Sequence, residues 1–316
     1  MDKINVGISS CLLGNRVRYD GQHKYDHFLV ETLGDYFEYS PVCPEVECGL
    51  TIPREAMRLT GSPESPRLVT IKSGTDHTDR MKRWGEEVLK ELAGRDLCGF
   101  IFKAKSPSSG MERIKVYPEK GGTPAKNGRG MFAAMFMEKF PLIPVEDEGR
   151  LHDPSLRENF IERVFAYKRW QALTRGTHSV HDLLQFHSSH KLLLMAHSNV
   201  HYRECGKIAA SATKTNLPDN EKSYFLTLME GMKKTATVSK NCNVLQHILG
   251  YFKKFLTGEE KAEALELIEQ YRKGFIPLIV PVTLMNHYVK KYNEKYLKTQ
   301  YYLNPHPMEL KLRNHS

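Results

Sequence analysis

The chain has 316 residues, of which 40% are hydrophobic and 26% charged, a composition typical of globular proteins and not of fibrous or disordered chains. Its formal net charge is +9. Residues 1–150 hold 22 basic and 22 acidic residues, so the whole excess of positive charge lies in residues 151–316. The length and this asymmetry predict two domains, 1–150 and 151–316, and a polyanionic partner for the second.

Short apolar segments alternate with helical patterns in the first half. Strands are expected at Ile4–Ile8, Phe37–Val42, Arg67–Ile71, Leu97–Lys103 and Leu142–Val145. The spacing of apolar residues predicts helices over Asp76–Gly94 and Met131–Lys139, whereas the glycine-rich segment Gly121–Gly130 is expected to be a loop. This alternation predicts an α/β domain with a Rossmann-like parallel sheet.

The second half shows helical patterns throughout. Helices are expected at Pro154–Leu173, Val180–His201, Tyr224–Met232, Val244–Leu256, Glu259–Arg272 and Leu284–Tyr296. Thr257 and Glu260 have the spacing of a capping box, which marks the start of the fifth of these helices. The C-terminal domain is therefore expected to be all-α.

The sequence indicates no contact with a membrane. Its longest nearly unbroken apolar run, Phe275–Met285, contains Pro277 and Pro281 and is too short to span a bilayer as a helix. Six cysteines without a secretory signal indicate a cytoplasmic, reducing compartment. In such a compartment cysteines serve as core residues, reactive thiols or metal ligands.

Three unusual motifs follow predicted strands in the first half. They are Ser9-Ser10-Cys11-Leu12-Leu13-Gly14, Cys43-Pro44-Glu45 and Ser106-Pro107-Ser108-Ser109-Gly110. Ligands of parallel sheets bind beyond the carboxyl ends of the strands, so Cys11, Cys43 and Ser109 are expected at a site. Taken singly, each motif is more often a structural turn, because a lone cysteine usually behaves as a small buried hydrophobic residue. A zinc site is disfavoured, since Cys43 and Cys48 have no second cysteine pair.

Together the three motifs resemble the TudS family of thiouracil desulfidases. That family carries Ser-x-Cys-Leu-Leu-Gly, Cys-Pro-Glu and Ser-Pro-Ser-Cys-Gly in the same order. The second half resembles the YbgA domain, through the segment from Phe186 to Ser198 and through Pro305-His306-Pro307. The combination of both resembles the RudS proteins, which remove sulfur from 4-thiouridine in transfer RNA.

The resemblance implies an enzyme with a 4Fe-4S cluster held by three protein ligands. Cys11 and Cys43 match the first two ligands. The iron without a protein ligand is a Lewis acid toward the thiocarbonyl sulfur, and water replaces that sulfur without net redox change. Glu45 matches the residue that transfers protons, and Ser106 matches a serine that hydrogen-bonds the substrate or water.

Ser109 departs from the family pattern, which has cysteine at the third ligand position. A serine hydroxyl stays protonated near neutral pH and is a hard ligand, so we expect weak cluster binding and little activity. Three explanations are open. Ser109 is an engineered replacement, which the intact remainder of the motif favours; it is a natural loss that leaves an RNA-binding protein; or Cys48 takes over as third ligand.

The second half contains basic clusters, two of them beside aromatic residues. They are Tyr167-Lys168-Arg169-Trp170, Lys233-Lys234, Lys253-Lys254 and Lys290-Lys291-Tyr292. Such clusters suit phosphate neutralisation and base stacking, although each alone is usually a solvated helix face. We expect the second domain to hold transfer RNA while the first takes in the base. Two alternatives are a desulfidase for free thiouracil or thionucleosides and a cluster-free RNA-binding protein.

Several histidines of the second half fall at helical spacing. They are His187, His190, His197 and His201. A metal-binding pair would need a nearby carboxylate ligand, so histidines with protein or solvent hydrogen-bond partners are the favoured interpretation.

Overall fold

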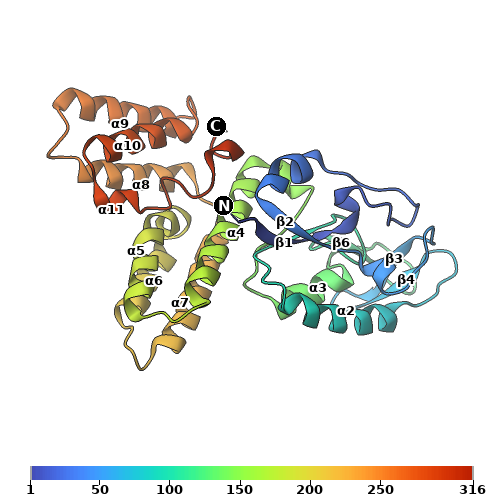
Figure 1. Ribbon diagram of the computed structural model, residues 1–316. Helices are drawn as coiled ribbons and strands as arrows, with labels where there is room; N and C mark the ends of the chain where they lie inside the picture. The colour runs from blue at the N-terminus through green and yellow to red at the C-terminus, as the bar shows by residue number, and fades with distance from the viewer. Residues whose placement is uncertain (1, 315–316) are drawn as a thin grey trace. The chain divides into compact units, whose positions relative to one another are not determined.

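The computed structural model describes residues 2–314, and the chain divides between Asp153 and Pro154 into two compact units (Figure 1). The first unit has the predicted parallel-sheet α/β architecture and the second is helical, which confirms the expected fold class. The division lies close to the expected boundary at residue 150. Within residues 2–314, no helix is both long and apolar enough to cross a membrane.

The first unit is built on a parallel sheet with the strand order β2-β1-β5-β8. Strand β1 (Ile4–Ser9) pairs with β2 (Phe37–Val42) on one side and with β5 (Phe100–Phe102) on the other. Strand β8 (Val145–Asp147) continues the sheet beside β5. Because these strands run parallel, their carboxyl ends meet at one edge of the sheet.

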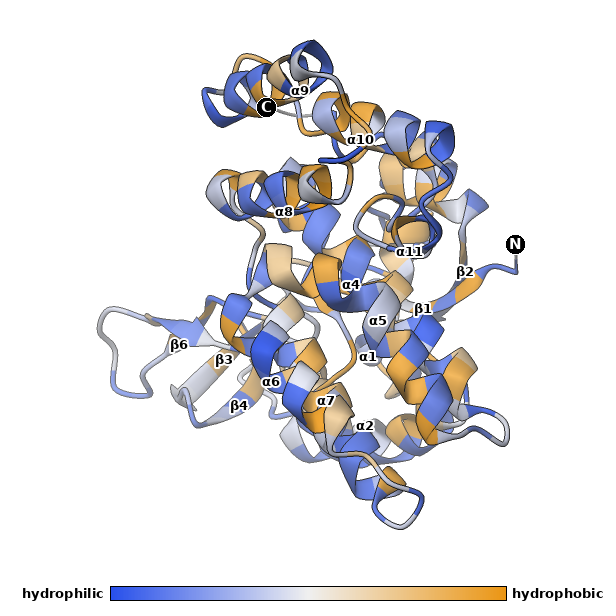
Figure 2. Cartoon of the chain, turned by 90° about the vertical axis from the view of Figure 1, so that its left-hand side faces the viewer, coloured by the Kyte–Doolittle hydropathy of each residue, from blue (hydrophilic) through white to orange (hydrophobic). Residues whose placement is uncertain are grey.

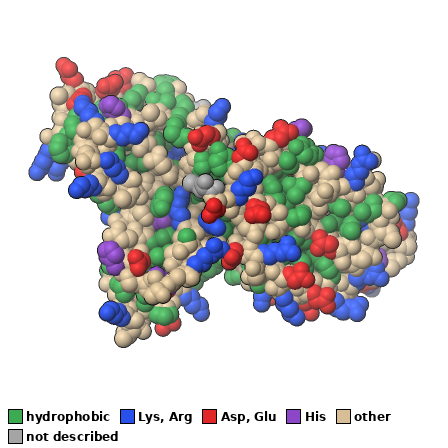
Figure 3. Space-filling view, viewed as in Figure 1, with side chains coloured by type: hydrophobic (Ala, Val, Ile, Leu, Met, Phe, Trp, Pro, Cys, Tyr) green, Lys and Arg blue, Asp and Glu red, His purple; other side chains and the backbone are tan. Residues whose placement is uncertain are grey.

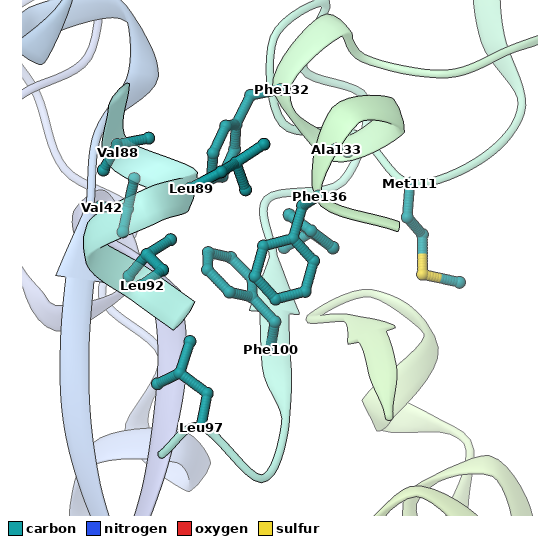
Figure 4. Close-up of a cluster of buried hydrophobic side chains, with 11 residues drawn as sticks. Val42, Val88, Leu89, Leu92, Leu97, Phe100, Met111, Phe132, Ala133 and Phe136 are labelled. Carbon is teal, nitrogen blue, oxygen red and sulfur yellow. The ribbon is translucent and has the colours of Figure 1, made fainter. Parts of the chain in front are cut away.

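The main core of this unit lies between the sheet and helices α2 (Thr78–Ala93) and α3 (Met131–Lys139), as Figure 4 shows. Its buried members are Val42, Val88, Leu89, Leu92, Leu97, Phe100, Phe102, Met111, Phe132, Ala133 and Phe136. The rings of Phe100 and Phe136 have their centroids 4.6 Å apart. A Cβ atom on Gly7 would lie 2.2 Å from the Phe100 ring, so only glycine lets that ring cover β1.

A second four-stranded sheet, of order β4-β3-β6-β7, was not expected. Strand β4 (Ser65–Thr70) covers most of the strand expected at Arg67–Ile71, but it pairs antiparallel with β3 (Met57–Ser62). Strand β6 (Ile114–Tyr117) runs parallel to β3. Strand β7 (Ala125–Gly128) lies within the segment expected to be a loop. It pairs antiparallel with β6 through its backbone, and most of its side chains are exposed, so it shows no apolar pattern.

The second unit consists of helices α4 to α11. Their bounds are α4 Pro154–Thr174, α5 Val180–His197, α6 Asn199–Ala210, α7 Leu217–Met232, α8 Val238–Tyr251, α9 Gly258–Arg272, α10 Ile279–Lys291 and α11 Lys295–Lys298. Figure 2 shows hydrophobic and hydrophilic residues interleaved along these helices, as expected for a packed helical domain. Thr257 and Glu260 form the expected capping box at the start of α9.

Two expected helices are each divided in the structure. Ser198 is extended, with φ −157° and ψ 112°, and its hydroxyl accepts a hydrogen bond from the His201 amide at 3.4 Å. The helix expected over Val180–His201 therefore ends at His197, because local capping overrides the continuing apolar pattern. The last expected helix breaks at Asn293, whose φ of 51° is left-handed and incompatible with a continuous α-helix.

A buried ion network ties α4 to the C-terminal segment of the second unit. Arg313 donates from Nε to Glu158 Oε1 and from Nη2 to Glu162 Oε1, both at 2.8 Å. His197 Nε2 lies 3.0 Å from Glu162 Oε2. This histidine therefore has a protein partner, as the favoured interpretation of the histidines expected.

The two carboxyl groups of this network titrate differently. Burial and the neighbouring Glu162 charge raise the pKa of Glu158. Burial also acts to raise the pKa of Glu162, but the hydrogen bond from His197 and the Arg313 charge hold it below its usual value. The Arg313 guanidinium, which bonds both groups, therefore offsets the cost of burying two carboxyl groups close together.

Replacing Arg313 by alanine should destabilise the second unit by about 3–5 kcal/mol, because it leaves buried carboxylates without their cation. Urea unfolding followed by Trp170 fluorescence, in a Trp84→Phe background, measures this free energy for the unit that contains Trp170. Arg272→Ala is the matched control, since Arg272 pairs with Glu269 at 2.7 Å with 62% of its side chain exposed. The control should change the free energy by less than about 1 kcal/mol. Equal effects of both substitutions would contradict the prediction.

Candidate active site

A cavity of about 340 Å³ lies at the carboxyl ends of β1, β2 and β5. Each of these strands leads into one of the three motifs. The lining of the cavity includes all five residues that the sequence singled out, namely Cys11, Cys43, Glu45, Ser106 and Ser109. The parallel sheet therefore brings together residues that are up to 98 positions apart in the chain.

Cys11 enters the cavity directly after β1. A short 3₁₀ helix, Ser10–Leu13, follows the strand and carries the thiol. The Lys24 amide donates to the Cys11 carbonyl at 2.8 Å, which fixes the backbone here. Burial raises the pKa of the Cys11 thiol to about 11, although the Lys103 ammonium acts to lower it.

Cys43 lies between β2 and the short helix α1 (Pro44–Glu47). Pro44 occupies the first turn of that helix, where a missing amide proton costs nothing. The Cys43 amide donates to Glu47 Oε1 at 2.6 Å. Burial raises the pKa of the Cys43 thiol, and the Cys43 charge in turn raises the pKa of Cys11. The two thiols are therefore electrostatic neighbours in one cavity.

Glu45 is held by an ion pair and a hydroxyl. Arg54 Nε donates to Glu45 Oε2 at 2.8 Å, and Ser108 Oγ donates to Glu45 Oε1 at 2.7 Å. The Arg54 side chain is only 7% exposed and that of Glu45 14%. Such a shielded, charge-assisted pair fixes the carboxylate with one oxygen on the arginine and the other toward the serine turn.

The serine turn, Ser106–Ser109, is organised around the Ser106 hydroxyl. This oxygen accepts hydrogen bonds from the Ser108 and Ser109 amides at 3.3 and 3.1 Å, and it lies 2.9 Å from Ser108 Oγ. A continuous chain of hydrogen bonds therefore runs from Ser106 through Ser108 to Glu45. The sequence motif singled out Ser106, but the residue in contact with Glu45 is Ser108.

Sequence reasoning missed a second ion pair at the cavity. Lys103 Nζ contacts Glu148 Oε1, and Glu148 Oε2 accepts a hydrogen bond from the Ala104 amide at 2.6 Å. Lys103 directly follows β5, at the same edge of the sheet as Cys11. The position of Lys103 directly after a predicted strand could have marked it as a site residue. Its pairing with Glu148, which follows β8, required the tertiary structure. Arg54 follows the Cys43-Pro44-Glu45 motif in the sequence, but its pairing with Glu45 likewise required the tertiary structure.

Cys48 does not line this cavity. Its thiol donates to the Glu45 carbonyl at 3.3 Å, and its side chain packs against the apolar cluster that contains Leu59 and Met81. Helix α1 thus turns Cys48 away from Cys43. The arrangement disfavours the explanation in which Cys48 serves as third ligand.

The donor set fits a 4Fe-4S cluster at two of three positions. Cys11 and Cys43 offer soft thiolate sulfurs to the same cavity, whereas Ser109 offers only a hydroxyl. Since burial raises both thiol pKa values, cluster iron would have to displace their protons on binding. Cys11 and Cys43 would hold the group, and Ser109, which the resemblance matches to the third ligand, offers no thiolate.

Comparisons with known proteins agree with the two-unit organisation. Residues 6–148 match the 2-thiouracil desulfurase family, and residues 191–307 match a family described as protein of unknown function, DUF1722. The uncharacterized protein YbgA of Escherichia coli strain K12 is 31% identical over 166 residues, which cover 52% of this chain and 95% of YbgA. The chain belongs to the YbgA family.

A solved structure of the 4Fe-4S-dependent thiouracil desulfidase TudS is also similar to part of this YbgA-family chain. It shares 31% sequence identity and covers 48% of this chain and 95% of its own, with a TM-score of 0.40. The YbgA-family chain thus joins a 2-thiouracil desulfurase region to a DUF1722 region.

Replacing Gly130 by alanine should displace the serine turn. A Cβ atom there would lie 2.6 Å from the Gly110 nitrogen and 2.7 Å from the Ser108 carbonyl carbon, both backbone atoms that cannot rotate away. We expect a loss of about 1–3 kcal/mol in the free energy of unfolding of the first unit, as in other overpacked sites. Urea unfolding followed by Trp84 fluorescence in a Trp170→Phe background measures it. The control is Gly34→Ala in the same unit, whose Cβ would meet the Leu29 carbonyl oxygen at 3.8 Å, an ordinary contact. Unaltered stability of Gly130→Ala would contradict the prediction.

Proposed function

We propose that the chain is a desulfidase that converts 4-thiouridine in transfer RNA to uridine, with a 4Fe-4S cluster held by Cys11 and Cys43 and with Ser109 at the third position. The observation that carries this proposal is the meeting of both thiols, Glu45 and the serine turn in one cavity. The match of residues 6–148 to the 2-thiouracil desulfurase family supports the chemistry. The cluster, when bound, supplies an open iron site that is a Lewis acid toward the thiocarbonyl sulfur.

The side chains around the cavity are arranged to move a proton. Arg54 holds the Glu45 carboxylate in position, and this carboxylate can accept a proton from the water that attacks the ring carbon. The hydrogen bonds from Ser106 through Ser108 to Glu45 give that proton a route back across the cavity. Overall, a thiocarbonyl and water give a carbonyl and hydrogen sulfide, and no electron is gained or lost.

The surface of the second unit supports RNA as the substrate. Lys233, Lys234, Lys253 and Lys254 are exposed, in a half of the chain that holds the whole excess of positive charge. The cluster from Tyr167 to Trp170 differs from the expectation, because Trp170 is buried. Its neighbour Arg169 lies 3.7 Å from the centroid of the Tyr301 ring. The compartment that suits free thiols and an iron–sulfur cluster is the reducing cytoplasm.

Two other functions have specific support. A cavity of about 340 Å³ is large enough for a base alone, which favours a desulfidase for free thiouracil or thionucleosides. Ser109 favours an RNA-binding protein without a cluster. Iron content separates the last function from the first two, and the salt dependence of turnover separates RNA from a free base.

Changing Ser109 to cysteine should increase both cluster occupancy and activity, because it supplies the third soft ligand. The wild-type chain and the Ser109→Cys variant are reconstituted anaerobically with iron and sulfide. Iron per chain is then measured, together with desulfidation of 4-thiouridine-containing transfer RNA and of free 4-thiouracil. Turnover of the RNA, but not of the free base, should fall steeply as salt increases. Ser108→Cys in the same turn is the control for adding a thiol.

Equal iron content and equal activity in wild type and Ser109→Cys would overturn the ligand assignment. Turnover of free 4-thiouracil without turnover of the RNA would favour the second function. Iron content and both activities are measured on the same preparations, so each change in activity is compared with the cluster content of that sample.

Replacing Glu45 by glutamine should lower kcat by about 10²–10⁴-fold, as for loss of a general base, while iron content stays unchanged. The measurement is made in the Ser109→Cys background with free 4-thiouracil. Ser108→Ala should have a smaller effect in the same direction, because Glu45 keeps its bond to Arg54. Glu64→Gln is the control, since Glu64 is exposed on the turn between β3 and β4. Full activity of Glu45→Gln would rule out its role in proton transfer.

A further inference from the structure

Four aromatic side chains of the second unit form two stacked pairs where α8 and α10 end and α11 begins. The rings of Tyr251 and Tyr296 stack with centroids 5.4 Å apart, and those of Phe255 and Tyr292 with centroids 5.2 Å apart; both pairs are inclined by 24°. Tyr251 and Phe255 are 36% and 53% exposed. Tyr292 and Tyr296 are half-buried, so each pair presents one exposed ring to solvent.

A buried layer holds this cluster in place. Phe252 is fully buried, and its ring centroid lies 6.0 Å from that of Tyr292 and 5.8 Å from that of Tyr288. Tyr288 is itself only 3% exposed. The exposed rings of Tyr251 and Phe255 are therefore held in a fixed position, because Phe252, which lies between them in the sequence, is anchored in the core. We call the four rings of the two pairs the platform.

Lysines surround the same platform. Lys191 Nζ lies 4.9 Å from the centroid of the Tyr296 ring, and Lys291 Nζ lies 5.0 Å from that of Tyr292. Lys291 also pairs with Glu260 of α9 at 2.7 Å, so its charge is shared with that carboxylate. Residues 244–256 and 284–298, which contain the four rings, hold six lysines and one acidic residue, Glu294. Basic side chains are visible over α8 and α11 in Figure 3.

We propose that this platform, Tyr251, Phe255, Tyr292 and Tyr296 with Lys191, Lys253, Lys254 and Lys291, binds unpaired bases of RNA by stacking. The excess of lysine favours a polyanionic ligand, and the exposed rings of Tyr251 and Phe255 favour a polyanion with aromatic bases. An acidic protein surface would satisfy the lysines but leave the ring faces without flat partners. The inference deepens the proposed function, on which it rests for RNA as the substrate, by naming the surface that holds it.

The test compares the full-length chain with two double variants. Binding of fluorescein-labelled oligouridine of 12 nucleotides and of unmodified transfer RNA is measured by anisotropy at several salt concentrations. Tyr251→Ala with Phe255→Ala should weaken oligouridine binding by about tenfold or more, with an unchanged salt slope, because stacking is lost. Lys253→Ala with Lys254→Ala should reduce the slope of log K against log salt by about 1.4, the value for two phosphate contacts on a single strand.

Two controls separate the platform from general effects. Lys214→Ala with Lys222→Ala removes the same charge from exposed lysines of the same unit outside the platform, and should reduce the slope less. Tyr251→Phe with Phe255→Tyr keeps both ring faces and should restore wild-type affinity, whereas a merely destabilising effect of the alanine variant would appear in its circular dichroism and thermal melt.

Four outcomes would overturn the platform. They are equal affinity of wild type and the aromatic double variant, equal slopes for both lysine pairs, absence of RNA binding by the wild type, and dimerisation of the wild type that the aromatic variant abolishes without a change in RNA affinity. Failure of the proposed function is distinguishable, since it would show as platform-dependent RNA binding without desulfidation of thiolated transfer RNA.

Discussion

The parallel pairing of β1 with β2 and β5 is the constraint on which the site depends. Strand β1 registers Ser9 against Val42, and Ile8 against Ile101 in β5. Because all three chains run in one direction, the segments that follow them must emerge at the same edge. Cys11, Cys43 and the serine turn are therefore brought to one cavity by the backbone hydrogen bonds of the sheet, independently of contacts between their side chains.

Within that cavity, charge pairing decides which groups can react. Arg54 holds Glu45 on one oxygen and leaves the other to Ser108, so the carboxylate faces the serine turn. Lys103, which pairs with Glu148, places an ammonium near Cys11; the ammonium acts against the rise in the Cys11 pKa that burial causes, whereas the Glu148 charge adds to that rise. A site of two thiols, a fixed carboxylate and hydroxyls is suited to move protons around a soft metal group. At Ser109, which the family resemblance matches to the third ligand, the cavity offers a hydroxyl instead of a thiol.

The two units use their charge differently. The first, residues 1–153, has 23 acidic and 22 basic residues, and two ion pairs among them lie at its cavity, Arg54 with Glu45 and Lys103 with Glu148. The second carries the excess, yet its buried charges serve packing, as in the network of Arg313, Glu158 and Glu162. Only charges outside that network are available to a partner. The total charge therefore predicts a polyanionic partner but does not locate the surface that binds it.

The local patterns that were strong in the sequence agree with the structure, because they arise from neighbours in the chain. Helix α3, strand β2 and the capping box of α9 all have the expected bounds or residues. The expected helix over Val180–His201 was wrong at Ser198, where a single cap competes with a long apolar pattern. Strand β7 was missed because its pairing is made by the backbone and leaves no pattern of side-chain burial.

The sequence by itself determined the α/β and helical halves, the three motifs and the separation of charge, since periodicity, turn residues and composition are properties of adjacent positions. Only the tertiary structure decided that Ser108, and not Ser106, contacts Glu45, that Arg54 pairs with Glu45, that Cys48 turns away, and that Tyr251 stacks on Tyr296 and Phe255 on Tyr292. These are contacts between segments distant in the chain, and their partners are chosen by how sheets and helices pack, which no local pattern encodes.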